Sequence, residues 1–204
     1  MAGEFLANPS RMYLILDVSA NGDPKNWKRP ADDVFNWPRL TQLSWLVYNE
    51  GRELVAQAND LIKPQGWTVP KKMETKYHLT TEKLEAEGIP VREALEKLVP
   101  QIDAAKYIIA HNVTFCEGVL TSEMTRLSMP HRLEVADKYA LMQEAAWYTK
   151  LPARGGRYKW PSLQDIHVKM FQARYANAGE AYADVATTAI VFFGLLDLEA
   201  IELF

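Results

Sequence analysis

Residues 12–18 have the sequence MYLILDV, and this stretch decides the fold. Every residue in it is hydrophobic except Asp17. An uninterrupted apolar run of this kind is typical of a central strand that is buried on both faces of a sheet. We therefore predict a central strand at the start of the domain, with the carboxylate of Asp17 at its carboxyl end.

The segments that follow predict a mixed sheet flanked by helices, an α/β fold. Residues 41–48 and 53–62 are the next two predicted strands, and the short turn NEG (residues 49–51) between them indicates an antiparallel hairpin. Residues 22–38 contain three prolines and two tryptophans, which predicts a long irregular loop. Strands and helices then alternate, with strands predicted at residues 106–111 and 133–136, and helices at residues 80–88, from 91, at 115–127, from 162 and at 181–204.

Composition argues for one ordinary globular domain. The 204 residues are 48% hydrophobic and 24% charged, which excludes a disordered or collagen-like chain. No apolar run approaches the ~20 residues of a membrane span, so we expect no membrane partner. The single cysteine excludes a disulfide framework and favours a cytoplasmic location. We expect residues 12–204 to form the domain, and residues 1–11 to be a disordered segment or an addition from cloning.

Four landmarks occur along the chain in an order that points to one family. They are Asp17 at the end of the first strand, HLT (residues 78–80), HNVTF (residues 111–115) and AYADV (residues 181–185). With them the sequence resembles the DEDDh exonuclease family, which includes the proofreading epsilon subunit of bacterial DNA polymerase III and ribonuclease T. The likeness is strongest to epsilon-like exonucleases with a YKWP segment, here residues 158–161. The resemblance implies a ribonuclease H-like fold, with a mixed five-stranded sheet flanked by helices in a single domain.

The resemblance also implies a reaction and a set of catalytic residues. Members of the family cleave the 3′-terminal phosphodiester with two Mg²⁺ or Mn²⁺ ions, held by four acids, beside a histidine that activates water. Asp17 and Asp184 match two of the acids. Ser19 stands in the place of a glutamate, Cys116 in the place of an aspartate, and Gly179 in the place of the histidine. The pattern therefore predicts a degenerate catalytic site.

Two retained carboxylates make a poor metal site. We expect Asp17 and Asp184 to hold one Mg²⁺ or Mn²⁺ ion weakly, or none, because hard cations so close together need several oxygen ligands. Asp23, in the long loop, is the neighbouring acid that could be recruited. Glu117 follows Cys116, and one residue along a helix turns its side chain by ~100°, away from the site. The alternative is a purely structural role, in which Asp17 caps a turn and Asp184 caps a helix.

Two stretches are candidates for nucleic-acid binding. In the relatives, the loop that carries His111, Asn112 and Phe115 borders the 3′-terminal nucleotide; the alternative is that these side chains satisfy backbone groups. Residues 150–160 (KLPARGGRYKW) contain four basic residues and no acid, a composition that suits phosphates and stacked bases. Its candidate binding residues are Arg154, Arg157, Tyr158 and Lys159. The alternative is a solvated loop with Trp160 in the core.

Three functions remain open at this point. The first is an exonuclease homologue that is inactive or strongly impaired and binds a single-stranded DNA or RNA 3′ end, or a protein partner. The second is an active, divergent, metal-dependent 3′–5′ exonuclease that uses Asp17, Asp184 and a recruited acid. The third is a protein-binding scaffold. The net charge of −3 indicates that any nucleic-acid partner is held by a local basic patch.

Overall fold

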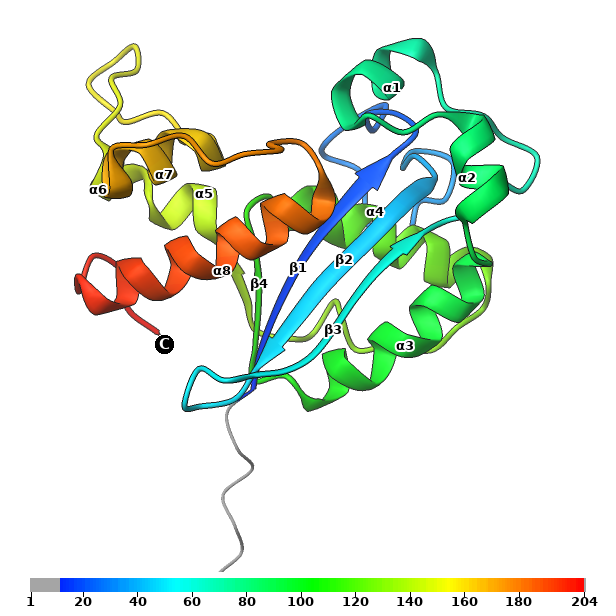
Figure 1. The fold of residues 1–204 in the computed structure, drawn as a ribbon, viewed down its shortest axis with the longest axis horizontal. Coiled ribbons are helices and arrows are strands. Elements are labelled where there is room, and N and C mark those ends of the chain that lie inside the picture. Colours follow the sequence, from blue (N-terminus) through cyan, green and yellow to red (C-terminus); the bar gives the residue numbers. More distant parts are fainter. Residues whose placement is uncertain (1–11, 204) are drawn as a thin grey trace, which may run out of the picture.

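A five-stranded mixed sheet forms the centre of the molecule (Figure 1). The structure, a computed structural model, describes residues 12–203, so the expectation for residues 1–11 lies outside the described part. The strand order is β3-β2-β1-β4-β5; β2 is antiparallel to β1 and β3, whereas β4 is parallel to β1 and β5. The strands are β1 (Tyr13–Ala20), β2 (Leu40–Tyr48), β3 (Leu54–Leu61), β4 (Tyr107–Ala110) and β5 (Lys138–Ala140).

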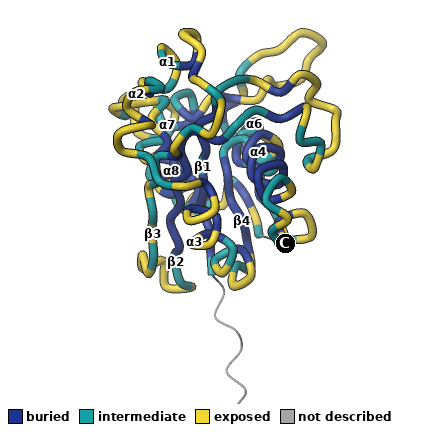
Figure 2. The backbone as a smooth tube through the Cα atoms, turned by 90° about the vertical axis from the view of Figure 1, so that its right-hand side faces the viewer, coloured by how far each residue is buried: buried dark blue, intermediate teal, exposed yellow. Residues whose placement is uncertain are grey.

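Helices cover both faces of this sheet. One face packs against α3 and α4, and the other against α8, with α7 packed on α8. Strands β1, β2 and β4 are buried between these layers, whereas the edge strand β3 is partly exposed and most of the connecting loops are exposed (Figure 2). The helices are α1 (Lys71–Tyr77), α2 (Thr81–Glu87), α3 (Val91–Ala104), α4 (Val113–Arg126), α5 (Leu141–Glu144), α6 (Ala146–Thr149), α7 (Leu163–Phe171) and α8 (Ala181–Asp197). Among residues 12–203, no helix has the length and apolar character needed to cross a membrane.

The alternation of side chains along β1 sends its residues into two separate cores. Leu14, Leu16 and Val18 pack in the cluster formed with α3 and α4. Tyr13 and Ile15 pack in the cluster formed with α8. The period of two therefore places Asp17 and Ser19 on the face of the sheet that α8 covers, near the end of the strand. The first predicted strand is confirmed, and it directs Asp17 towards the helix that carries Asp184.

Local signals in the sequence explain where several helices begin. The side chain of Asn112 accepts a hydrogen bond from the backbone N–H of Phe115 at 3.2 Å and caps α4. Ser162 and Asp165 form a reciprocal capping box at the start of α7, as predicted. Thr80 caps α2 by accepting from the N–H of Lys83. These caps satisfy backbone donors that would otherwise lack partners.

The structure corrects two of the predicted elements. Residues 133–136 form a turn, because the N–H groups of Val135 and Ala136 both donate to the carbonyl of Arg132. The strand of this region is β5, which begins two residues later. Val135 is 75% exposed, so the apolar residues here do not share one buried surface. The last helix ends at Asp197 rather than at residue 204. The N–H of Ala200 bonds to the carbonyl of Leu195, which closes the helix end.

The long loop of residues 21–39 is irregular, as predicted, and is anchored to α4. Glu123, which is buried in α4, accepts from Arg39 Nε at 2.7 Å and from the N–H of Leu40 at 3.1 Å. Arg126 Nη1 lies 3.2 Å from the same carboxylate, and its other Nη donates to loop carbonyls. The ring of Trp37 packs directly on Gly118, where any Cβ would lie 2.4 Å from it. The tertiary structure therefore holds this loop in place beside the end of β1.

Candidate nucleic-acid site

A cavity of about 350 Å³ lies at the carboxyl end of β1. Asp17 comes from this strand, Asn112 and Phe115 from the start of α4, and Asp184 from the first turn of α8. The cavity is completed by the long loop, by the last turn of α1 and by Gly179. The structure thus brings together both retained acids and two of the predicted nucleic-acid-binding residues.

Asp184 is already engaged within the protein. Its carboxylate accepts a hydrogen bond from Tyr175 Oη at 2.8 Å and from the N–H of Gly179 at 3.1 Å. Burial raises the pKa of Asp184, although these two donors lower it. Burial, followed by the hydrogen bond to Asp184, raises the pKa of the Tyr175 phenol, so Tyr175 stays a donor at neutral pH. Part of the hydrogen-bonding capacity of the Asp184 carboxylate is therefore already used within the protein.

Asp17 lies in an unfavourable place for a charge. Burial raises its pKa well above the usual range, and the neighbouring charge of Asp184 raises it further. The backbone of Val18 and the ammonium of Lys76 act in the opposite direction. Two buried like charges disfavour ionisation of both groups. The electrostatics are those of a carboxylate pair with too little positive charge around it.

The three positions that the resemblance predicts to be substituted add no ligand. Ser19 is 1% exposed, and its hydroxyl has no hydrogen-bond partner among the described residues. Cys116 is buried in the core between the sheet and α4, as a small apolar residue, and burial raises the pKa of its thiol. Gly179 has φ +97°, and a Cβ on it would lie 3.0 Å from the carbonyl oxygen of Lys76. A histidine at this position would be strained in both respects.

The acidic side chains of this cavity do not fit the two divalent ions used by the family that the sequence resembles. Within residues 12–203, no three His, Cys, Asp or Glu side chains lie close enough to hold one metal ion together. Two carboxylates, one of them bonded to Tyr175, supply neither the ligand number nor the charge that such a site requires. No step of a hydrolytic reaction can be assigned to these residues.

Asp23 lines the same cavity, but it is neutralised by lysines. Its Oδ2 lies 2.9 Å from Lys72 Nζ, and its Oδ1 lies 3.9 Å from Lys76 Nζ. Glu117, as predicted, points elsewhere, because it pairs with Lys138 of β5 at 2.9 Å. The carboxylate of Asp23 therefore contributes negative charge to the cavity, but it pairs with two lysines of α1 and does not form a cluster with Asp17 and Asp184.

Of the three candidate binding residues predicted in the HNVTF motif, His111 is the one that does not line this cavity. Burial lowers the pKa of its imidazole to about 4, and the charge that opposes this comes from Asp165 of α7. Its Nδ1 is buried and has no hydrogen-bond partner among the described residues. Asn112, by contrast, lines the cavity while capping α4, and Phe115 forms its wall together with Trp27, whose ring centroid is 6.0 Å away.

The basic stretch predicted for nucleic-acid binding borders a second cavity, of about 540 Å³. Arg157 and Tyr158 line it, whereas Arg154 and Lys159 do not. Trp160 lines it as well and is 60% exposed, so the alternative of a core position is wrong. Trp147 of α6 is 73% exposed and meets Tyr158 edge to face, with ring centroids 5.1 Å apart. Three exposed aromatic rings therefore gather beside a basic loop.

One backbone hydrogen bond connects the segments that line the two cavities. Asn112 lines the first cavity, and its neighbour His111 accepts a hydrogen bond from the N–H of Met142 at 3.2 Å. The next residue, Gln143, lines the second cavity.

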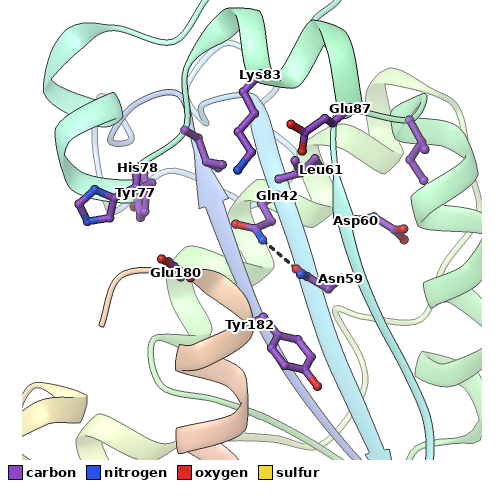
Figure 3. A pocket seen from close by; sticks show the side chains of 12 residues that line it. Gln42, Asn59, Asp60, Leu61, Tyr77, His78, Lys83, Glu87, Glu180 and Tyr182 are labelled. Carbon is purple, nitrogen blue, oxygen red and sulfur yellow. Dashed lines mark hydrogen bonds between the residues drawn. The ribbon is translucent and has the colours of Figure 1, made fainter. Parts of the chain in front are cut away.

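A third cavity, of about 470 Å³, lies on the other side of Tyr77 (Figure 3). Its floor carries Gln42 of β2, which donates to Asn59 Oδ1 of β3 at 2.7 Å. Lys83 points into the space from above, and Glu180 lies at the start of α8 (Figure 3). Tyr77 lines both this cavity and the one with Asp17, so its ring forms a partition between them.

Several residues of the site were not predicted from the sequence. For Trp27 the sequence leaves two roles open, as an anchor of the long loop or as part of an exposed contact surface. It gives no role to Lys76, Tyr77, Trp147 or Tyr175. Lys76 and Tyr77 directly precede the HLT motif, so their place beside a motif was a usable signal. Trp147 belongs to a short helix of four residues, which has no clear periodicity.

The sequence matches no model of a known protein family and no curated protein. The structure, however, is similar to solved structures of E. coli exonuclease I. The complex with a dA16 oligonucleotide has a TM-score of 0.70 and 15% sequence identity, and covers 92% of this chain and 41% of that chain. The structure described as suggesting how processivity is achieved has a TM-score of 0.71 and 14% identity, with the same coverage.

A third structure, the ExoI/SSB-Ct complex, has a TM-score of 0.69 and 13% identity, and again covers 92% of this chain and 41% of that chain. The chain thus spans about two fifths of the length of these exonuclease I structures. At such identities the likeness shows the fold, and the predicted ribonuclease H-like architecture is confirmed. The finer likeness to epsilon-like exonucleases stays a prediction.

Proposed function

We propose that this protein binds the 3′ end of a single-stranded nucleic acid and does not hydrolyse it efficiently. The observation that carries the proposal is a pair of cavities whose lining segments are linked by the hydrogen bond between Met142 and His111. One holds Asp17 and Asp184 with no further ligand, and the other is lined by Arg157 and exposed aromatic rings. The similar fold of exonuclease I, seen in complexes with dA16 and dT13 oligonucleotides, supports this class of ligand.

The chemistry of the first cavity argues against efficient cleavage. Phosphodiester hydrolysis by this class of fold depends on cations that stabilise the attacking and leaving oxygens, and on a base for the water. Here Asp184 is bonded to Tyr175, no histidine lines the described cavity, and Gly179 has a backbone unsuited to one. What the cavity retains is a wall of Asn112, Phe115 and Trp27 beside the strand end.

The second cavity has the features of a surface that binds single strands. Such surfaces combine positive charge with aromatic rings on which bases stack, each worth about 1–3 kcal/mol by alanine substitution. Trp147, Tyr158 and Trp160 supply the rings, and Arg157 supplies a charge in the same lining. We therefore assign the terminal nucleotide to the first cavity and the preceding nucleotides to the second.

The binding test uses a 5′-fluorescein oligo(dT) of ~12 nucleotides, and an oligo(U) of the same length, in fluorescence anisotropy. We expect binding that weakens as salt rises, because phosphate contacts release counterions. Arg157→Gln should weaken binding and reduce the salt slope by ~0.7, the value for one phosphate contact on a single strand. Lys63→Gln, an exposed charge outside both cavities, is the matched control. Salt-independent binding, or none, would favour a protein-binding scaffold instead.

The second test measures degradation of the same oligonucleotide with Mg²⁺ or Mn²⁺. We expect no ladder of shortened products from the wild-type chain. Asp17→Ala runs beside it to reveal contaminating nuclease. A metal-dependent ladder that disappears in Asp17→Ala would establish the divergent active enzyme in place of the binding protein.

A further inference from the structure

The cavity at the end of β1 presents an electrostatic difficulty for its proposed ligand. Asp17, Asp23 and Asp184 all line it, and a phosphate would have to approach three carboxylates. In the family that the sequence resembles, divalent ions neutralise such carboxylates. Among residues 12–203, no three acidic, histidine or cysteine side chains lie close enough to hold such an ion. Among the described residues that line the cavity, Lys76 carries the only positive charge.

The position of Lys76 is determined by its neighbours. It belongs to the last turn of α1, and its Nζ lies 3.9 Å from Asp23 Oδ1 and 4.6 Å from the ring centroid of Tyr77. Its charge also acts on Asp17. Lys72 lies closer to Asp23, at 2.9 Å, so that carboxylate already has a partner. The side chain of Lys76 is 50% exposed and keeps donors available for a ligand.

The glycine at position 179 is part of the same arrangement. The carbonyl oxygen of Lys76 lies 3.0 Å from the place that a Cβ on Gly179 would occupy. Any side chain there would push against the last turn of α1. A glycine at position 179 therefore leaves room for the backbone turn that carries Lys76.

We infer that the ammonium of Lys76 takes the place of the divalent ions in this cavity and faces the terminal phosphodiester of the bound strand. Binding is then independent of metal. The identity of the ligand rests on the proposed function, whereas the role of Lys76 as the resident cation does not. A single fixed charge with three donors can neutralise a phosphate without polarising it as two metal ions would. The same residue thus explains how the cavity binds and why it does not cleave.

The first experiment measures Mn²⁺ binding by electron paramagnetic resonance, without nucleic acid. We expect no bound Mn²⁺ in the wild-type chain at millimolar metal, and weak but measurable binding of one Mn²⁺ ion in Lys76→Gln, where Asp17 and Asp184 lose the ammonium that lines their cavity while Asp23 stays paired with Lys72. Lys83→Gln, on α2 at the neighbouring cavity, should leave Mn²⁺ binding unchanged. Tight Mn²⁺ binding by the wild type, or no gain in Lys76→Gln, would overturn the inference.

The second experiment measures oligo(dT) binding by anisotropy, with EDTA and with Mg²⁺. We expect equal affinity in both, and a loss of about tenfold or more in Lys76→Gln, as for a charge-assisted hydrogen bond. Affinity that requires Mg²⁺ would contradict the inference and leave the proposed function standing. If the wild type binds no oligonucleotide, the proposed function fails, and the Mn²⁺ measurement alone decides the role of Lys76. Unchanged melting temperatures establish that each variant is folded.

Discussion

At the scale of single residues, burial without a sufficient counter-charge sets the properties of Asp17 and Asp184. The pKa of each is raised first by burial, and Asp17 also by the charge of its neighbour. A carboxyl whose pKa is raised in the folded state binds its proton more tightly there than in the unfolded chain. Its contribution to stability is present at low pH and is lost as pH rises through the folded pKa.

The substitution Asp17→Asn should therefore stabilise the protein at neutral pH. The amide keeps the shape of the side chain and removes the buried charge beside Asp184. We expect the melting temperature at pH 7 to rise by ~2–4 °C, equivalent to about 1 kcal/mol at this chain length. The gain should shrink as pH falls and Asp17 takes up its proton. Asp23→Asn is the control, because it loses its ion pairs with Lys72 and Lys76 and should not be stabilised. A destabilised Asp17→Asn protein would contradict this account.

His111 should give the opposite dependence on pH. Burial lowers its pKa to about 4, so between that value and about 6.5 the unfolded chain binds a proton that the folded chain does not. The native state loses stability as pH falls through this range, by on the order of 3 kcal/mol. His111→Phe should remove that loss, measured by urea unfolding at several pH values. Parallel stability curves for the two proteins would show that His111 is not held neutral.

At the scale of elements, α4 joins the site to the long loop. Its first turn supplies Asn112 and Phe115, and its last two turns hold the loop through Glu123 and Arg126. The loop in turn carries Trp27 to the cavity. Packing along one helix therefore couples a buried ion-pair network to the wall of the binding site.

Removal of the acid at the centre of this network should be costly. Glu123→Ala leaves Arg39 and Arg126 without their buried carboxylate partner, and loss of one partner of such a pair typically costs about 3–5 kcal/mol. Denaturant unfolding measures the change. Glu93→Ala, which breaks an exposed ion pair with Lys97 of 3.6 Å, should change stability by less than about 0.5 kcal/mol. Similar losses in both variants would mean that the network contributes little.

Contact between α1 and the loop before α8 can be tested in the backbone. Gly179 and Gly155 both have positive φ, but only Gly179 faces a close neighbour, the carbonyl of Lys76, while nothing lies within 4 Å of a Cβ at Gly155. Each change to alanine should cost about 1–2 kcal/mol through backbone strain. Gly179→Ala should cost more than Gly155→Ala, as measured by thermal unfolding. Equal costs would indicate that α1 is free to move.

At the scale of the whole molecule, the parallel strands β1 and β4 end at the same edge of the sheet. The helices that follow or cover these ends therefore meet there, and so do the two cavities. Neither cavity is formed by one element alone. These ends of the strands offer a nucleic-acid strand one cavity lined by charged residues and one lined by aromatic rings.

This arrangement predicts how affinity depends on strand length. Affinity for oligo(dT) should rise with each added nucleotide until the strand reaches the aromatic surface, and then level off. Trp147→Ala should remove most of that rise while affecting the shortest strands little. Phe35→Ala, an exposed aromatic of the long loop that lines neither cavity, is the control. Anisotropy titrations over a series of lengths measure this, and an unchanged series in Trp147→Ala would exclude the aromatic surface from binding.

Much of the fold could be predicted because its signals are local. The apolar run around Asp17, the hairpin turn at residues 49–51 and the capping residues Asn112 and Ser162 each act within a few positions of themselves. Residues 133–136 form a turn although their sequence, LEVA, predicts a strand. Three of the four residues are apolar, but only Leu133 is buried. The short helices α5 and α6 were missed, since four residues carry no readable period.

What the sequence determined by itself is the central strand, the hairpin that follows it, the mixed α/β class and the place of Asp17 at a strand end. The substituted positions Ser19, Cys116 and Gly179 stay a prediction from the resemblance. Only the tertiary structure decided that Asp23 is held by lysines, that Lys76 lines the same cavity as Asp17 and Asp184, and that Trp147 contacts Tyr158. The physical reason is the range of the interactions. Hydrophobic periodicity and capping act between near neighbours, whereas the charge balance of a cavity depends on side chains brought together from distant parts of the chain.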